Sequence, residues 1–172
     1  TIYNYIDLGM IRIKNFHLPL KLRRKSKGSV IRKNKKILGD SISIRPYHIN
    51  NREEFGHWEI DTVIGSKSKK DEVLLTLVER KTRNAMVRKI SGKTADAVMA
   101  ELYQLKEYFG SEFSRVFKTI TSDNGSEFSD LSALRTSNTK IYFTHPYSSF
   151  ERGTNERHNG LLRRFIPKGR RI

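Results

Sequence analysis

The 172-residue sequence has no cysteine and only four prolines. Without thiols the chain can form neither a disulfide nor a thiolate metal site, so any metal that it binds must be held by oxygen or imidazole ligands. The lack of cysteine also fits a reducing compartment, and we expect a cytoplasmic protein. The sequence shows no signal peptide and no apolar stretch long enough to span a bilayer, so we expect no membrane partner.

Acidic residues are scarce as well. The chain has 18 Asp and Glu against 34 Lys and Arg, which gives a formal net charge of +16. Residues 1–50 hold 12 basic and 2 acidic residues, whereas residues 51–172 hold 22 and 16. A chain this basic favours a polyanionic partner, and nucleic acid is the first candidate. The run KLRRKSKGSVIRKNKK at 21–36 has the composition of a linker or DNA-contacting arm, and a solvated tail is the alternative.

Two regions are expected along the chain. Residues 1–54 are predicted to be a basic linker preceded by the tail of an upstream helical region, because TIYNYIDLG at 1–9 has apolar residues at helical spacing and a glycine stop. Residues 55–172 are predicted to form the folded domain. The chain begins at Thr1 and stops at Ile172, directly after a basic segment, so we expect a piece of a longer protein.

From residue 57 the apolar pattern predicts a sheet. HWEIDTVIG alternates between two faces, and strands at 57–65, 72–80 and 83–90 are expected to form an antiparallel meander. A helix at 94–109, capped by Thr94, a strand at 115–122, a short helix at 126–135, a strand at 140–145 and a helix at 150–165 follow. The order β-β-β-α-β-α-β-α indicates an α/β fold with a mixed five-stranded sheet and helices on its faces.

Three acidic residues stand out in this layout. Asp61 lies within an apolar strand, Asp123 ends another strand at a glycine turn, and Glu156 lies on the last, basic helix. Acidic side chains inside a fold are costly unless they are paired or bind a cation. If the strands that carry the aspartates are neighbours, the three carboxylates can meet outside the carboxyl ends of the strands. Singly, each has a simpler interpretation: an edge-strand residue, a turn former and a helix-surface residue.

The segments around these acids resemble the catalytic core of IS30-type insertion-sequence transposases. The resemblance rests on GHWEIDTVIG (56–65), TSDNGSEF (121–128) and HPYSSFERGTNERHNGLLRRFIPKG (145–169), and it covers roughly residues 55–169. It implies the RNase H-like fold of the DDE transposase and retroviral-integrase superfamily. TIYNYIDLG resembles the end of the helix-turn-helix region that precedes the core in that family. The resemblance also implies that this core is truncated at its C-terminus, because family members continue past the PKG segment.

The resemblance implies that Asp61, Asp123 and Glu156 are both the catalytic residues and the metal ligands. Two Mg²⁺ ions, with Mn²⁺ as a substitute, would be bound, with Asp61 bridging both and the other acids each taking one. Glu156 follows Asp123 by 33 positions, within the range of such cores. Glu151 is a rival for the third acid, but in the family pattern the acid follows Gly-Thr-Asn, which selects Glu156.

Further residues are candidates for DNA contact: Asn124, Asn159, Arg163, Arg164 and Lys168. Asn159 and Arg163 follow Glu156 at helical spacing and are expected on its face. For the arginines, a solvated helix face is the alternative. For His57 and His145 a structural role is favoured over proton transfer.

The predicted function is DNA transposition by metal-dependent strand cleavage and strand transfer. The partners expected are the element ends and target DNA, with a homo-oligomer in the active complex. Two alternatives stay open: an RNase H-like nuclease that only hydrolyses, and an inactive DNA-binding fragment of a transposase.

Overall fold

The computed structural model describes residues 2–18, 37–66, 71–146 and 148–172. The chain divides into two compact units, Thr1–Lys33 and Asn34–Ile172. The basic run at 21–36, predicted to be a linker or DNA-contacting arm, lies outside the described residues. The unit that contains the sheet starts at Asn34, ahead of the predicted boundary at residue 55.

The first unit contains the short helix α1 (Ile2–Asp7). Gly9 follows it with a positive φ of 71°, and the Met10 backbone N–H donates to the Tyr5 carbonyl at 2.9 Å. A glycine in this conformation just after a helix satisfies the last carbonyls and ends the helix. The predicted helix and its glycine stop are therefore both present.

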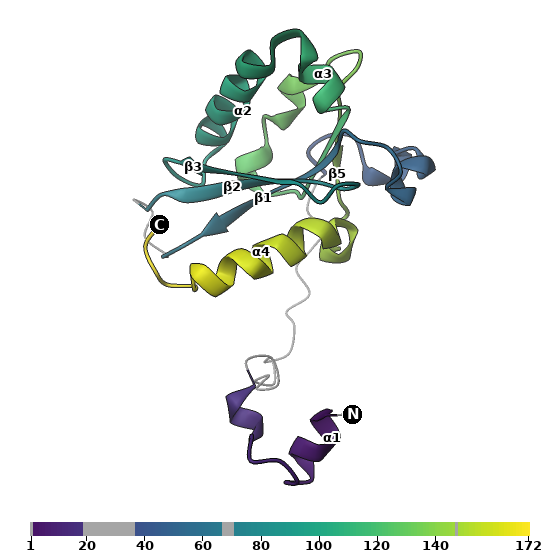
Figure 1. Ribbon diagram of the computed structural model, residues 1–172. Helices are drawn as coiled ribbons and strands as arrows, with labels where there is room; N and C mark the ends of the chain where they lie inside the picture. The colour runs from purple at the N-terminus through teal and green to yellow at the C-terminus, as the bar shows by residue number, and fades with distance from the viewer. Residues whose placement is uncertain (1, 19–36, 67–70, 147) are drawn as a thin grey trace. The chain divides into compact units, whose positions relative to one another are not determined.

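The second unit is built on a five-stranded sheet in the order β3-β2-β1-β4-β5 (Figure 1). Its strands are β1 (His57–Ile64), β2 (Val73–Glu79), β3 (Ala85–Ile90), β4 (Thr119–Ser122) and β5 (Lys140–Phe143). The first three form an antiparallel meander, and β4 and β5 run parallel to β1. The predicted mixed five-stranded sheet is confirmed.

The helices cover both faces of this sheet (Figure 1). α2 (Ala95–Phe109) and the short α3 (Phe113–Val116) lie on one face, and α4 (Gly153–Phe165) lies on the other. The Thr94 hydroxyl accepts from the Ala97 N–H at 3.2 Å, so the predicted cap of α2 is in place. None of the helices in the described part of the chain is long and apolar enough to cross a membrane.

Between α2 and β5, the start of one predicted element and the helix type of another are wrong. The strand expected from residue 115 begins at 119, because α3 occupies residues 113–116. The helix expected at 126–135 consists of two 3₁₀ turns, Ser126–Phe128 and Leu131–Leu134. Phe128, Leu131 and Leu134 are fully buried at a spacing of three residues, which matches the three residues per turn of a 3₁₀ helix.

The two faces of the sheet differ in chemistry. On the face of α2, side chains such as Trp58 and Ile60 of β1 join the apolar core with Leu102 of α2. On the other face, the alternation of β1 places Glu59 and Asp61 toward α4. The sequence thus builds an apolar layer beneath α2 and a polar layer beneath α4.

Residues ahead of the sheet are attached to its edge. The Phe143 N–H of β5 donates to the Asp40 carbonyl at 2.8 Å, and Ser41 forms an isolated parallel bridge with Phe143. Arg45 Nη1 donates to the Thr121 hydroxyl at 3.0 Å. Two 3₁₀ turns, η2 (Ile42–Ile44) and η3 (Tyr47–Asn51), then lead to β1. This packing explains why the second unit begins so early.

Candidate active site

Asp61 and Asp123 occupy equivalent places on neighbouring parallel strands. In the register of β1 and β4, Glu59 pairs with Thr121. Two residues further on, the chain reaches Asp61 inside β1 and Asp123 directly after β4. The predicted adjacency of these two strands is confirmed, and it brings the two aspartates to one edge of the polar layer.

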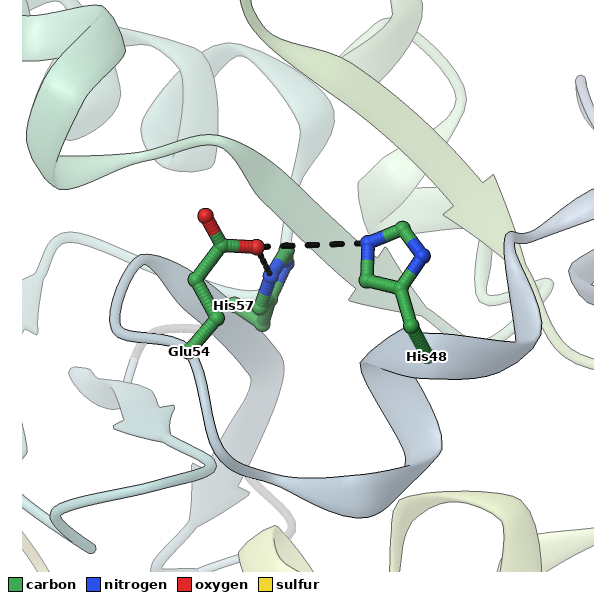
Figure 2. A group of neighbouring side chains, drawn as sticks. All are labelled: His48, Glu54 and His57. Carbon is green, nitrogen blue, oxygen red and sulfur yellow. Dashed lines mark hydrogen bonds and ion pairs between the residues drawn. The ribbon is translucent and has the colours of Figure 1, made fainter.

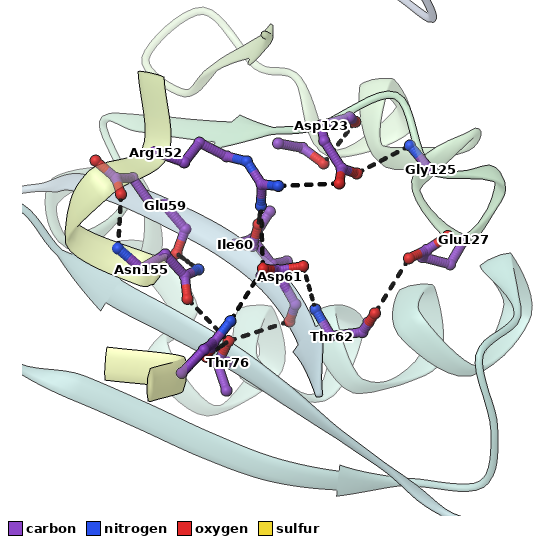
Figure 3. A network of polar contacts seen from close by, with 12 residues as sticks. Glu59, Ile60, Asp61, Thr62, Thr76, Asp123, Gly125, Glu127, Arg152 and Asn155 are labelled. Carbon is purple, nitrogen blue, oxygen red and sulfur yellow. Dashed lines mark hydrogen bonds and ion pairs between the residues drawn. The ribbon is translucent and has the colours of Figure 1, made fainter. Parts of the chain in front are cut away.

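The guanidinium of Arg152 lies between the two carboxylates (Figure 3). Its Nη2 donates to Asp123 Oδ2 at 2.9 Å, and its Nη1 is 3.5 Å from Asp61 Oδ2. Nη1 also donates to the Ile60 carbonyl at 2.9 Å. The Arg152 side chain is only 10% exposed, and its Nε–H has no acceptor among the described residues. A single buried cation therefore serves both aspartates.

The Asp61 carboxyl is in an unfavourable environment for its charge. Burial raises its pKa above the ordinary value, because the charged form loses hydration. The Arg152 charge and the Thr62 N–H, which donates to Asp61 Oδ1 at 2.8 Å, oppose this rise, whereas Asp123 adds to it. A carboxylate in this state is stabilised by any further cation that reaches it.

Glu59 anchors the start of α4 to the sheet. This side chain is fully buried, and its Oε1 accepts from Arg80 Nη1 at 2.7 Å. Its Oε2 accepts from the Asn155 backbone N–H at 2.9 Å, and the Asn155 amide donates to the Glu59 carbonyl at 3.1 Å. The free N–H groups of a helix start need such an acceptor. The buried Glu59–Arg80 pair therefore fixes where α4 begins.

Asn159 links α4 to the catalytic candidate on β1. Its Nδ2 donates to Asp61 Oδ2 at 2.9 Å. The Thr76 hydroxyl of β2 lies 3.1 Å from Asn159 Oδ1, 3.2 Å from Asn155 Oδ1 and 3.2 Å from the Asp61 carbonyl. The Asn159 amide is thus engaged at both ends within the chain, where it orients the Asp61 carboxylate.

The two rivals for the third acid are in different environments. Glu156 is exposed on the first turn of α4, and its carboxylate has no hydrogen bond or ion pair within the described residues. Glu151 is half-buried, and its two oxygens contact the His145 backbone N–H at 2.8 Å and Nδ1 at 2.7 Å. Across the described ranges, the carboxylates of Asp61, Asp123 and Glu156 are not all within 4.8 Å of one another. The structure brings two of the three acids together, and Glu156 lies one helical turn from Arg152.

The remaining candidates for DNA contact differ in burial and in whether they already form hydrogen bonds within the chain. Asn124 Oδ1 accepts from the Leu38 N–H at 3.1 Å, and its Nδ2 donates to the Thr144 carbonyl at 2.6 Å, so this amide holds three segments together. Arg163 is half-buried, with its Nη1 enclosed and lacking an acceptor in the described part of the chain. Arg164 and Lys168 are exposed.

Sequence reasoning assigned no role to Arg152, and it predicted Glu127 only as a group near the site or on the surface. Arg152 precedes Glu156 by four positions, one helical turn, and this spacing was the available signal. Glu127 is buried, and its Oε1 contacts the Thr62 hydroxyl at 3.1 Å and Lys93 Nζ at 3.0 Å. Lys93 therefore has a carboxylate partner inside the chain.

Comparisons with known proteins place this arrangement in context. The family model described as "Integrase core domain" matches residues 51–149. The probable transposase for the insertion-like sequence element IS1161 of Streptococcus salivarius is 47% identical over 169 residues, which is 98% of this chain and 47% of that protein. Transposase InsI for the element IS30A of Escherichia coli K12 is 37% identical over 131 residues, 76% of this chain and 33% of that protein. The chain thus spans less than half the length of these relatives.

The fold also has a counterpart among solved structures. A chain in the cryo-EM structure of the simian T-cell lymphotropic virus intasome in complex with PP2A regulatory subunit B56 gamma superposes with a TM-score of 0.50. The match has 21% sequence identity and covers 63% of this chain and 38% of that one. At this identity the likeness concerns the fold alone.

Proposed function

Because the chain belongs to the integrase core domain family, we propose that it is the catalytic core of an IS30-type insertion-sequence transposase. The reaction proposed is phosphoryl transfer on DNA. Water hydrolyses a phosphodiester at the end of the element and frees a 3′-hydroxyl. This hydroxyl then attacks a phosphate of the target strand and displaces the 3′-oxygen of the neighbouring target nucleotide, which leaves as a new 3′-hydroxyl, with no covalent enzyme intermediate. This reaction needs acidic residues that bind cations next to the reacting phosphate.

The observation that carries this proposal is the cation shared by Asp61 and Asp123. The two carboxylates come from adjoining parallel strands and already direct one oxygen each toward the guanidinium of Arg152. All the acidic donors here are carboxylate oxygens, which suits Mg²⁺ or Mn²⁺. Bound divalent ions, two by the family resemblance, would stabilise charge on the attacking and leaving oxygens. Glu156 is proposed as the third ligand because Glu151 is already committed to His145.

Other residues of the chain have supporting roles in this proposal. Asn159 orients the Asp61 carboxylate, and Glu59 fixes the start of the helix that carries Glu156. The exposed Arg164 and Lys168 are proposed to contact DNA phosphates, together with the basic run at 21–36. The first unit is proposed to be the tail of a helix-turn-helix region, and the active complex to be a homo-oligomer on DNA.

A metal titration tests the assignment of the acids. Mn²⁺ binding to the chain is measured by calorimetry for Asp61→Asn, Asp123→Asn, Glu156→Gln and Glu151→Gln, with Glu107→Gln on the exposed side of α2 as the matched control. We expect weaker binding in the first three variants and unchanged binding in the last two. Loss of binding in Glu151→Gln but not in Glu156→Gln would move the third ligand to Glu151.

A strand-transfer assay tests the reaction. The chain is incubated with Mn²⁺, a pre-cleaved duplex that carries a free 3′-hydroxyl and a target plasmid, and joined products are separated from nicked ones. Joined product that disappears in Asp123→Asn is the expected result. Nicking without joining would favour the hydrolytic nuclease, and DNA binding without either would favour the inactive fragment.

A further inference from the structure

A second group of potential metal ligands lies at the start of β1, away from Asp61. His48 of η3, Glu54 of the following loop and His57 at the start of β1 converge on one point (Figure 2). One ligand atom from each lies within 4.8 Å of the others, and in the described residues no other trio of His, Asp or Glu meets this condition. Along the strand, His57 is four residues from Asp61, or about 13 Å.

The spacing of these atoms is close to that of a tetrahedral ion site. Zn²⁺ bound by imidazole and carboxylate at about 2.0–2.1 Å has ligand atoms about 3.3 Å apart. His57 Nε2 lies 3.0 Å from Glu54 Oε2, and His48 Nε2 lies 3.9 Å from the same oxygen. The His48 side chain is 64% exposed, so it is free to move the remaining few tenths of an ångström.

Two of the three ligands are held in place by outer hydrogen bonds. Buried His57 has its Nδ1 2.9 Å from the Thr119 hydroxyl of β4. The second oxygen of Glu54 accepts from Lys118 Nζ at 2.5 Å, which leaves Oε2 directed toward the histidines. Metal-binding histidines characteristically donate a hydrogen bond from their other ring N–H to an oxygen acceptor.

The second ring nitrogen of His57 decides whether its Nε2 can bind an ion. Because the Thr119 hydroxyl can accept as well as donate, Nδ1 of His57 can carry the ring proton and leave the Nε2 lone pair for an ion.

We propose that His48, Glu54 and His57 bind one zinc-class transition-metal ion, with a fourth position open to solvent. Two imidazoles and one carboxylate form a ligand set that suits Zn²⁺ and disfavours Mg²⁺, which prefers six oxygens. The ion would tie η3 to the start of β1 and to the residues that begin β4. This site is separate from the Asp61–Asp123 pair and does not depend on the transposase activity.

Calorimetry with Zn²⁺ tests this site in the full chain. The chain is stripped with chelator and titrated with Zn²⁺ in excess Mg²⁺, which keeps the carboxylate site from competing. We expect one Zn²⁺ per chain. His48→Ala and Glu54→Gln should each weaken Zn²⁺ binding by more than about 100-fold. An effect of about 100-fold is the most that is typical when only a hydrogen-bond partner of a metal ligand is lost. Both side chains are exposed, and unchanged circular dichroism without Zn²⁺ checks that each variant folds.

The matched control is His17→Ala, which removes an exposed histidine of the first unit. It should bind Zn²⁺ as the parent chain does. The proposal is overturned if the parent chain binds no Zn²⁺, if either His48→Ala or Glu54→Gln retains the parent affinity, or if His17→Ala loses it. Zn²⁺ should also raise the melting temperature of the parent chain but not that of His48→Ala.

Discussion

Arg152 contacts both of the aspartates that are proposed to bind a divalent ion. It contacts Asp61 and Asp123 with two different nitrogens, so ion binding to both carboxylates requires the guanidinium to withdraw. An adjacent cation lowers the pKa of a carboxylate by about 1–3 units. Arg152 therefore keeps the site from carrying two unpaired charges, and under the proposed function it would compete with the metal ion.

Arg152→Gln should destabilise the metal-free chain and strengthen its binding of Mn²⁺. We expect an affinity gain of about tenfold, because one pKa unit of competing interaction corresponds to a factor of ten. Calorimetry with Mn²⁺ and chemical denaturation without it measure the two effects. Arg157→Gln, at an exposed arginine of the same helix, is the control. Equal or weaker Mn²⁺ binding in Arg152→Gln would show that the guanidinium does not compete.

The raised pKa of Asp61 gives the metal-free chain a definite pH dependence. The folded state holds the Asp61 proton more tightly than the unfolded state, whose value is near 3.8. Folding stability therefore falls as the pH rises from that value through the higher folded pKa, and the loss persists above it. Asp61→Asn should remove this fall.

Denaturant unfolding from pH 3.5 to 7 in the presence of chelator measures the effect. The unfolding free energy of Asp61→Asn relative to the parent chain should increase across this range, and Mn²⁺ at pH 7 should reduce the difference. Asp130→Asn, at an exposed aspartate outside the site, should show no such increase. A constant difference between Asp61→Asn and the parent chain would contradict the prediction.

At the scale of single residues, the sequence predicted Asp61 and Asp123 as site residues, but it did not predict that Arg152 is the cation between them. Asp61 interrupts an apolar alternation and Asp123 ends a strand at a glycine turn, so both are visible as local departures from a pattern. Arg152 lies in a segment with many basic residues, where its four-residue spacing from Glu156 is the one local signal. Its role arises from contacts with residues about 30 and 90 positions away in the sequence, which only the fold brings together.

At the scale of elements, α4 depends on a buried charge pair. Glu59 is fully buried against Arg80 and accepts the Asn155 N–H, so removal of its charge leaves a buried guanidinium unpaired. Loss of one partner of such a pair typically costs about 3–5 kcal/mol. We therefore expect Glu59→Gln to lower the free energy of unfolding by about 3 kcal/mol or more.

Chemical denaturation measures this loss. Glu112→Gln, which breaks the exposed pair with Arg115, is the matched control and should cost only about 0–1 kcal/mol. If Glu59→Gln were as mild as Glu112→Gln, the pair would not anchor α4.

The elements that were predicted well carry a regular pattern, and those that were not are set by packing. The alternation of residues 57–65 and the Thr94 cap define β1 and α2 locally. At 126–135 the same apolar residues are compatible with an α-helix or with 3₁₀ turns, and the space beneath the sheet decides between them. Local sequence does not contain that information.

At the scale of the whole molecule, the family predicted from three motifs is confirmed, and so is the mixed sheet. The strong positive charge adds an expectation about DNA. Residues 21–36 contain nine Lys and Arg, and each phosphate contact contributes about 0.9 to the slope of log affinity against log salt. If this run is a DNA-contacting arm, replacing its basic residues with Gln should make the slope shallower by several units.

Fluorescence anisotropy with a short duplex, in chelator and over a salt series, measures this slope. Arg115→Gln, which removes one exposed charge elsewhere, should change it by at most about one unit. An unchanged slope in the variant of 21–36 would favour the solvated-tail interpretation.

The two unlike faces of the sheet have a consequence for local unfolding. No residue of α4 belongs to the apolar core of the described chain, and its buried side chains, Thr154 and Asn155, are polar. Because few apolar contacts hold it, α4 should open independently of the strands. Its amide hydrogens are expected to exchange with solvent faster than those of β1 and β2, and Mn²⁺ should slow that exchange unless Asp61 is replaced. Under the proposed function, α4, which carries Glu156, would then rearrange around metal and DNA while the strands beneath it stay folded.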